Sequence, residues 1–220
     1  VFQLHAQLPC VVWQAKQHLP ALRIGYIQTA GGALPGGMSR TVAQLLADEL
    51  LCDHITAAPA YGGLAEAMST IGALHAGIAA RGWDCAVVGP GPGIIGSATA
   101  LGNGAMVALD SAHAALALGC KTVLVARASS GDQRPRHQGI SHHTLTVLEL
   151  LLGEVHVGLT ASAPRPAQLD RHAVTQYNVD LPSYLLSGLP STTMGRSADQ
   201  DPLFFEQALA GGAALANAAG

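Results

Sequence analysis

The sequence has few charged residues and no long hydrophobic run. Charged residues make up 11% of its 220 positions, under half of the roughly 25% that is usual in soluble domains. With so little surface charge, we expect apolar surface to be covered by a second copy, in a homodimer or larger assembly. No apolar stretch reaches the length of about 18 residues that a transmembrane helix requires, so no membrane partner is expected.

Other signals are missing as well. The 11 lysines and arginines form no basic stripe and the formal net charge is −3, so nucleic acid is not expected as a partner. No signal peptide opens the sequence, which favours a cytoplasmic location. Since Val1 already falls in an expected strand, the sequence looks trimmed, and we expect a segment to precede it.

Several sequence motifs of catalytic and metal sites are absent. The four cysteines (Cys10, Cys52, Cys85 and Cys120) form no CxxC pair, which argues against a zinc knuckle. Each lies beside aliphatic residues, so we expect buried, reduced thiols, with a reactive thiol as the alternative. The HExxH, GxSxG and GK[ST] motifs do not occur, and no metal site is predicted.

What the sequence does contain is an alternation of short β-branched runs with longer runs rich in Ala and Leu. The pattern predicts strands at residues 1–8, 10–13, 23–29, 54–58, 84–89, 121–127 and 154–160. It predicts helices at residues 39–51, 64–81, 104–118 and 141–152. A terminal helix is expected after residue 200, with Asp201 as its cap, Pro202 at its first position and an interruption at Gly211-Gly212.

This alternation is typical of an α/β protein with a parallel sheet covered on both faces. We expect a three-layer α/β/α sandwich whose mainly parallel, Rossmann-like sheet has five or six strands. Residues 1–160 would form this core, and residues 161–220 would be a linker and a C-terminal helical extension that packs on it.

Two glycine-rich loops follow expected strands, at the sheet edge where open α/β sheets bind ligands. In residues 30–37, Gly31 and Gly32 would let the backbone approach an anion, and Arg40 lies in the first turn of the next helix. Residues 89–104 hold six glycines after a buried strand. The ligand-binding candidates in this second loop are Gly91, Gly93, Gly96, Thr99 and Asn103. An ordinary glycine-rich turn is the alternative for the first loop.

The spacing of Gly91, Gly93 and Gly96 matches the GxGxxG pattern. A dinucleotide site also needs a helix that begins inside the motif and an acidic residue about twenty positions later. Asp110 lies near that offset but inside the next expected helix. A phosphate or carboxylate held by loop amides is therefore preferred to NAD or FAD, and the cofactor is left unknown.

A third loop, residues 128–141, carries the most polar stretch of the chain. Arg134 and Arg136 could grip a carboxylate or phosphate, and His137 could transfer protons. The next expected helix begins with the candidates Ser141, His142, His143 and Thr144. Side chains of neighbouring helical residues diverge by about 100°, so we do not expect His142 and His143 to share a metal. The alternative is a structural network that ties the loop to the domain.

A fourth loop precedes the expected helix at residues 64–81. Glu66 would lie in the first turn of that helix, where the helix dipole favours a carboxylate. Glu66 could act as a general base or pair with an arginine. The plainer interpretation is an ordinary carboxylate at a helix N-terminus.

These stretches together resemble a bacterial domain of unknown function, number 3866. The resemblance rests on residues 24–37, 61–67, 89–104, 129–147, 193–196 and 201–212, above all on the RPRHxGxSHH pattern. It implies a longer cytosolic bacterial protein with a β-rich segment before residue 1, and it implies no known activity. Where the family pattern has carboxylates in the first and fourth loops, this chain has Ala30 and Leu64. That argues against a carboxylate-based metal site and in favour of the Arg/His loop.

Three hypotheses follow. The first is an enzyme acting on a small anionic metabolite, held by loop amides and by Arg134 and Arg136, with His137 or His142 as general acid/base. It predicts a histidine that points into a pocket beside the second glycine-rich loop. The second is a binding or regulatory module, with the histidines turned away from the pocket. The third is a structural domain, with the polar loop buried and no cavity.

Overall fold

The largest sheet of the computed structural model is parallel and has four strands. The structure describes residues 1–97, 99 and 101–220. In the order β3-β2-β1-β4, the strands are Ala65–Ala67, Asp53–Ala57, Ile24–Thr29 and Cys85–Pro90. Every residue of β1 is buried, because the strand lies inside the sheet and both of its faces are covered. The chain is thus a mixed α/β protein, as its alternating pattern predicts.

The second half of the chain forms a smaller parallel pair, β7 (His156–Leu159) with β8 (Ala173–Gln176). Two extended segments lie between this pair and β4. The Phe2 amide donates to the carbonyl of Val88 at 2.9 Å, and the Val125 amide donates to the carbonyl of Val1 at 2.8 Å. Hydrogen bonds through residues 1–2 and 122–125 therefore join the four-stranded sheet to the β7–β8 pair.

Seven α-helices surround these strands in the described part of the chain. They are α1 (Leu8–His18), α2 (Arg40–Ala47), α3 (Thr70–His75), α4 (Val107–Ala117), α5 (His142–Leu150), α6 (Leu181–Leu186) and α7 (Pro202–Ala219). Two predicted helix starts are confirmed: the Ser39 side chain accepts from the Val42 amide, and the Ser141 side chain accepts from the His143 amide. No helix in the described ranges has both the length and the apolar character of a membrane span.

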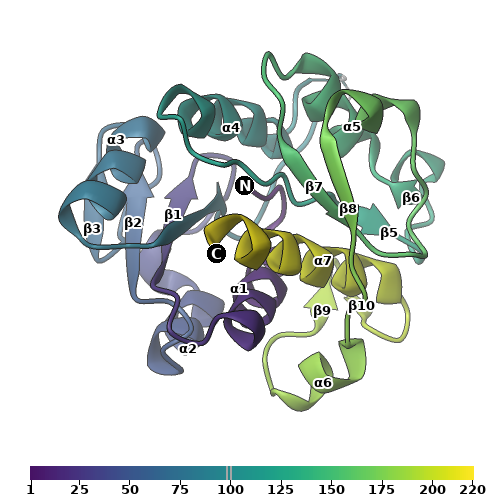
Figure 1. Cartoon of the computed structure of the whole chain (residues 1–220), viewed down its shortest axis with the longest axis horizontal. Coiled ribbons are helices and arrows are strands. Elements are labelled where there is room, and N and C mark those ends of the chain that lie inside the picture. Colours follow the sequence, from purple (N-terminus) through teal and green to yellow (C-terminus); the bar gives the residue numbers. More distant parts are fainter. Residues whose placement is uncertain (98, 100) are drawn as a thin grey trace.

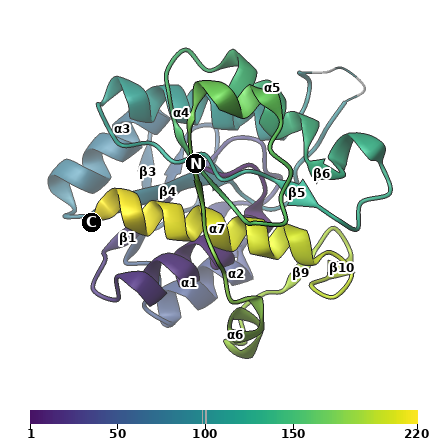
Figure 2. The ribbon, with the colours of Figure 1, turned by 45° about the vertical axis from the view of Figure 1, so that its right-hand side comes forward.

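The C-terminal helix α7 crosses the middle of the molecule, between α1 and β7 (Figures 1 and 2). The expected interruption at Gly211-Gly212 is wrong, since the helix continues to Ala219. A Cβ added to Gly211 would lie 2.6 Å from Val125, and one added to Gly212 would lie 2.5 Å from the Val11 carbonyl oxygen. These glycines let α7 pack closely on its neighbours, and that burial outweighs their low helix propensity.

Four predicted elements differ from the structure. Residues 121–127, expected as a strand, carry only an isolated bridge from Val123 to His156, and the next strand begins at Ala128. Residues 10–13, expected as a strand, lie inside α1, because a short apolar run does not by itself distinguish a buried helix from a buried strand. Residues 1–8 leave the extended conformation at His5, where a 3₁₀ turn leads into α1. The helix expected at residues 64–81 begins only at Thr70, since residues 65–67 pair with β2.

All four cysteines have free thiols. Cys10 is buried, Cys85 and Cys120 are half-buried, and Cys52 is exposed. The expectation that all four would be buried is therefore wrong for Cys52. This residue lies at the surface, in the connection between α2 and β2.

Two short hairpins bring distant parts of the chain together. One joins β5 (Ala128–Ser129) to β6 (Gly139–Ile140), around the Arg/His loop. The other joins β9 (Thr192–Thr193) to β10 (Arg196–Ser197). Both lie near the N-terminal end of α7, on the side away from β3 (Figure 1).

Candidate functional site

A cavity of about 630 Å³ lies beyond the carboxyl end of β4. The second glycine-rich loop, the Arg/His loop and the β9–β10 hairpin each contribute to its wall. Its lining includes Gly91, Gly93, Gly96, Asn103, Arg127, Arg134, Arg136, His137, His143 and Met194. Among the lining residues that the structure describes there are three arginines and no carboxylate, so the charged side chains of the lining are all positive.

Arg127 is the most deeply buried of these arginines, with 3% of its surface exposed. Its Nε is buried and has no hydrogen-bond partner among residues 1–97, 99 and 101–220. Its terminal nitrogens have only long contacts, 3.5 Å to His143 Nδ1, 3.6 Å to the Met194 sulfur and 3.7 Å to an Asp132 oxygen. Burial, together with the guanidinium of Arg134, lowers the pKa of Arg127 to about 10, so it stays charged at neutral pH.

Asp132 lies behind the cavity wall and fixes the neighbouring arginines. Arg134 donates to it through Nε at 2.9 Å and through Nη2 at 2.8 Å. Arg196 approaches the same carboxylate at 3.5 Å. Hydrogen bonds from Arg134 hold the pKa of Asp132 well below its usual range, although burial acts in the opposite direction. Arg134 therefore lines the cavity with its guanidinium already engaged by a carboxylate.

Arg136 differs from Arg134 in this respect. It is exposed and lines the cavity, and the described residues offer it no ion-pair partner. Of the two arginines that the sequence singles out, Arg136 is the better placed to reach a ligand in solution.

Asp201 connects the β9–β10 hairpin to the start of the Arg/His loop. Its buried carboxylate accepts hydrogen bonds from Ser129 Oγ at 2.6 Å, from the Ser130 amide at 2.8 Å and from Arg196 Nε at 3.0 Å. Asp201 occupies the N-cap position of α7 and Pro202 begins the helix, as expected, but the Asp201 side chain makes no capping hydrogen bond because these partners already engage the carboxylate. The hairpin thereby places Met194 against the cavity.

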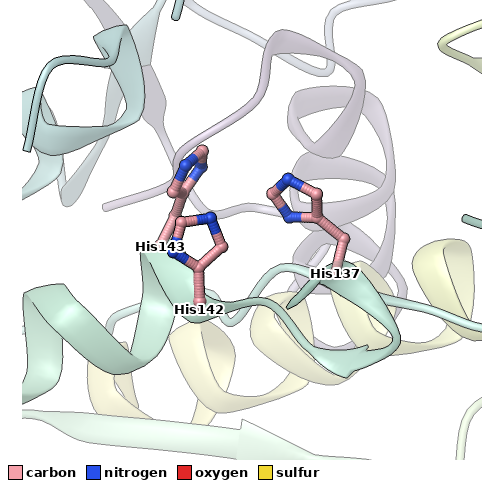
Figure 3. Close-up of side chains that lie close together, drawn as sticks. All are labelled: His137, His142 and His143. Carbon is pink, nitrogen blue, oxygen red and sulfur yellow. The ribbon is translucent and has the colours of Figure 1, made fainter. Parts of the chain in front are cut away.

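Three imidazoles gather at the N-terminal end of α5 (Figure 3). The ring centroids are 4.1 Å apart for His142 and His143, 4.9 Å for His137 and His142, and 5.0 Å for His137 and His143. One ring nitrogen from each residue lies within 4.8 Å of the other two. The expectation that His142 and His143 diverge too far to share a metal is therefore wrong, because side-chain rotation brings both rings toward His137.

Surrounding groups keep these imidazoles uncharged. Burial is the largest cause of the lowered pKa of each of the three, and Arg127 and Arg134 act in the same direction. The pKa is about 3 for His137 and about 4 for His143. The Ser141 hydroxyl lies 2.8 Å from His137 Nδ1 and holds that ring in place.

The first glycine-rich loop supports the second one and does not line the cavity. A Cβ on Gly31 would lie 2.7 Å from the Gly104 carbonyl oxygen, and one on Gly32 would lie 2.5 Å from that of Gly91. Arg40 is exposed at the start of α2 and is absent from the lining, although its neighbour Thr41 is part of it.

The second glycine-rich loop reaches the cavity through its glycines and Asn103, whose side chain also accepts from the Ala105 amide. Thr99 is exposed and does not line the cavity, although its hydroxyl contacts that of Ser97, which does. Ala98 and Ala100 of this loop lie outside the described residues. Helix α4 begins only at Val107, well after the GxGxxG spacing ends, so the helix position that dinucleotide binding requires is not met.

Two further candidates lie away from the lining. Glu66 is exposed on β3, where its carboxylate accepts from the Gly62 amide at 2.9 Å, so its expected position in a helical first turn is wrong. Thr144 is buried, donates to Gln3 and accepts from the Arg127 amide at 3.0 Å. Thr144 therefore fixes the backbone of Arg127.

Sequence reasoning missed Arg127 and His5. Arg127 ends the run expected as a strand at residues 121–127, and its place at a strand's carboxyl end is a signal that could have identified it. His5 lines the cavity, with Nδ1 3.3 Å from the Pro90 carbonyl oxygen and Nε2 2.9 Å from Ser39 Oγ. No local motif marks His5, because its partners lie far along the chain.

A family model described as "Protein of unknown function (DUF3866)" matches residues 1–212. No curated protein and no solved structure gives a significant match.

Proposed function

Since the chain belongs to the DUF3866 family, whose function is unknown, we propose its function from its own site. The protein binds a small metabolite with a phosphate or carboxylate group and acts on it as an enzyme. The anion occupies the cavity between the second glycine-rich loop and the Arg/His loop, and His137 and His143 face it as the reactive groups, whereas His142 lies outside the lining.

The observation that carries this proposal is the state of Arg127. A buried guanidinium normally has its donors paired, because an unpaired buried charge is costly. Arg127 has an unpartnered Nε and only long contacts elsewhere, and it lines an open cavity. An anion in that cavity would supply the missing acceptor, and Arg136 could reach the same anion.

The histidines favour chemistry over simple binding. His137 and His143 line the cavity together with Gly91 and Gly93, which is the arrangement that the enzyme hypothesis expects. A bound anion would raise the lowered pKa of a neighbouring imidazole, and an imidazole whose pKa lies near the working pH can transfer a proton with an effect of about 10²–10⁴-fold in rate. A binding module with its histidines turned away is the less favoured alternative.

Direct titration tests the proposal. Sulfate, inorganic phosphate and small dicarboxylates are titrated into the wild type by calorimetry, and then into Arg136→Ala. We expect at least one of these anions to bind, and the variant to lose about tenfold in affinity, the equivalent of about 1.4 kcal/mol. Arg165→Ala serves as the control, since Arg165 is exposed and lies outside the cavity lining.

Two results would contradict the proposal. The first is that no anion of the panel binds the wild type. The second is that Arg165→Ala weakens binding as much as Arg136→Ala does. If an anion binds, its organic esters and amides are the first compounds to assay for turnover, with His143→Asn as the comparison.

The fold carries a smaller proposal. We propose that the extended segments at residues 1–2 and 122–125 continue the sheet from β4 to β7, as in a Rossmann-like three-layer sandwich. The hydrogen bonds from Phe2 to Val88 and from Leu124 to His156, both 2.9 Å, support this interpretation.

A further inference from the structure

We propose that His137, His142 and His143 bind a single divalent transition-metal ion, with Zn²⁺ as the reference case. This inference rests on the proposed function, because it identifies what the histidines hold beside the bound anion. It concerns three side chains that come from one turn and the start of one helix (Figure 3).

The geometry is close to that of a metal site. A tetrahedral zinc ion with bonds of about 2.0–2.1 Å holds its ligand nitrogens roughly 3.4 Å apart. One nitrogen from each histidine already lies within 4.8 Å of the others, so modest ring rotations suffice to reach that spacing. No hydrogen bond joins any two of these imidazoles within the described part of the chain, so no such bond has to be broken.

A second observation points to a missing partner. The Nε2 atom of His142 is buried, and no residue that the structure describes forms a hydrogen bond with it. In the same cluster, the Ser141 hydroxyl engages His137 Nδ1 at 2.8 Å, which leaves Nε2 as the free nitrogen of that ring. A hydrogen bond to the far nitrogen of a ligating imidazole is the usual way in which proteins orient metal-binding histidines.

The donor set selects the class of ion. Three imidazole nitrogens suit zinc, cobalt, nickel and copper, whereas magnesium and calcium prefer oxygen ligands. Three protein ligands leave one position of a tetrahedral ion open, as in zinc sites that bind water or substrate. That position would face the cavity, because His137 and His143 line it.

The arginines oppose a bare cation. Arg127 lies 3.5 Å from His143 Nδ1, and Arg134 and Arg136 line the same cavity. A bound anion offsets these charges, so the ion and the anion should strengthen each other's binding. The cation would also take over the role assigned to a free imidazole, since a water molecule on zinc loses its proton near neutral pH.

The test measures metal binding directly. The wild type, freed of metal with a chelator, is titrated with Zn²⁺ against a chromogenic competitor, in chloride buffer and again in sulfate buffer. We expect one ion per chain and tighter binding in sulfate. Loss of a group that only supports a metal ligand costs roughly 10–100-fold in metal affinity. His142→Ala and His143→Ala each remove a ligand itself, so each should weaken Zn²⁺ binding by more than that. His75→Ala, which changes an exposed histidine on α3, should bind as the wild type does.

Two further measurements guard against a folding artefact. Thermal unfolding checks that each variant is folded, and Co²⁺ added to the wild type should give the intense visible absorption of a tetrahedral site. Arg127→Met should bind Zn²⁺ in chloride at least as tightly as the wild type, because a like charge has been removed. The inference is overturned if the wild type binds no stoichiometric Zn²⁺, or if the two histidine variants match His75→Ala.

Failure of the metal site is distinguishable from failure of the anion site. Sulfate binding is measured on the same samples with excess chelator present. If sulfate binds but Zn²⁺ does not, the metal inference is wrong and the proposed function stands. If Zn²⁺ binds and sulfate does not, the anion proposal is wrong, and the expected strengthening by sulfate is lost with it.

Discussion

Replacing Arg127 by methionine separates a functional role of this side chain from a structural one. Methionine fills much of the same volume without charge or donors. A pKa of about 10, against an ordinary 12.5, means that the surroundings of Arg127, burial first and then the charge of Arg134, disfavour the charged guanidinium by roughly 3 kcal/mol. Because the pKa of Arg127 is lowered, this cost to the stability of the fold is fully present at neutral pH and fades only as the pH rises above about 10.

The substitution leaves no other charge without a partner. Asp132 keeps both hydrogen bonds from Arg134 and its contact with Arg196 at 3.5 Å. Exchange of a poorly paired buried charge for an apolar side chain is often neutral or stabilising. We therefore expect the unfolding free energy of Arg127→Met to equal or exceed that of the wild type, to within about 1 kcal/mol.

Binding should change in the opposite direction. A hydrogen bond to a charged group is worth about 1.5–3 kcal/mol, so loss of Arg127 should weaken sulfate or phosphate binding roughly 10- to 100-fold. Urea denaturation gives the stability, calorimetry gives the affinity, and Arg165→Met serves as the matched control. A variant destabilised by more than about 3 kcal/mol would refute the reasoning, since that loss is typical of a broken buried ion pair.

Three further predictions concern the supports of the site. Asp201→Ala should cost about 3–5 kcal/mol in urea denaturation, because it leaves Arg196 without its closest carboxylate, and a loss below about 1 kcal/mol would contradict this role. Hydrogen bonds from Arg134 lower the pKa of Asp132, so its stabilising contribution should be complete above about pH 4 and decline as the pH falls through the lowered pKa. Asp132→Asn should flatten that acid slope, and an unchanged slope would rule the carboxylate out as its source. Gly32→Ala should lower the unfolding free energy by about 1–3 kcal/mol and weaken anion binding, because the new Cβ would lie 2.5 Å from a carbonyl oxygen of the second glycine-rich loop. A variant as stable as the wild type would show that the two loops can separate freely.

The parts of the fold that sequence reasoning predicted correctly are those set by neighbouring residues. The strand predicted at residues 23–29 rests on Ile24, Tyr26 and Ile27, and residues 24–29 form the buried β1. Ser39 and Ser141 each precede a helical pattern, and each side chain accepts from an amide of the first turn. For the two serines the deciding hydrogen bond lies within three residues, so the local pattern contains the information, whereas β1 was found from its residue types although its pairing partners are distant.

The errors arise where a distant partner decides between two local conformations. Residues 10–13 are apolar enough for a strand, but they pack as part of α1 against α7, almost two hundred positions later. Residues 65–67 resemble the start of a helix, yet they add an edge strand to β2. Gly211 and Gly212 look like helix breakers, and only the contacts with Val125 and Val11 explain why the helix passes through them.

The candidate site shows the same division. The sequence by itself placed arginines, histidines and glycines in loops that follow strands, and it indicated an anion as the ligand. It did not indicate that Arg127 is buried with an unpartnered Nε, nor that three imidazoles meet at the start of α5. Those features depend on side-chain rotation and on the hairpin at residues 192–197, held by Asp201. Only the tertiary structure decides them, because burial and convergence are properties of contacts between distant segments.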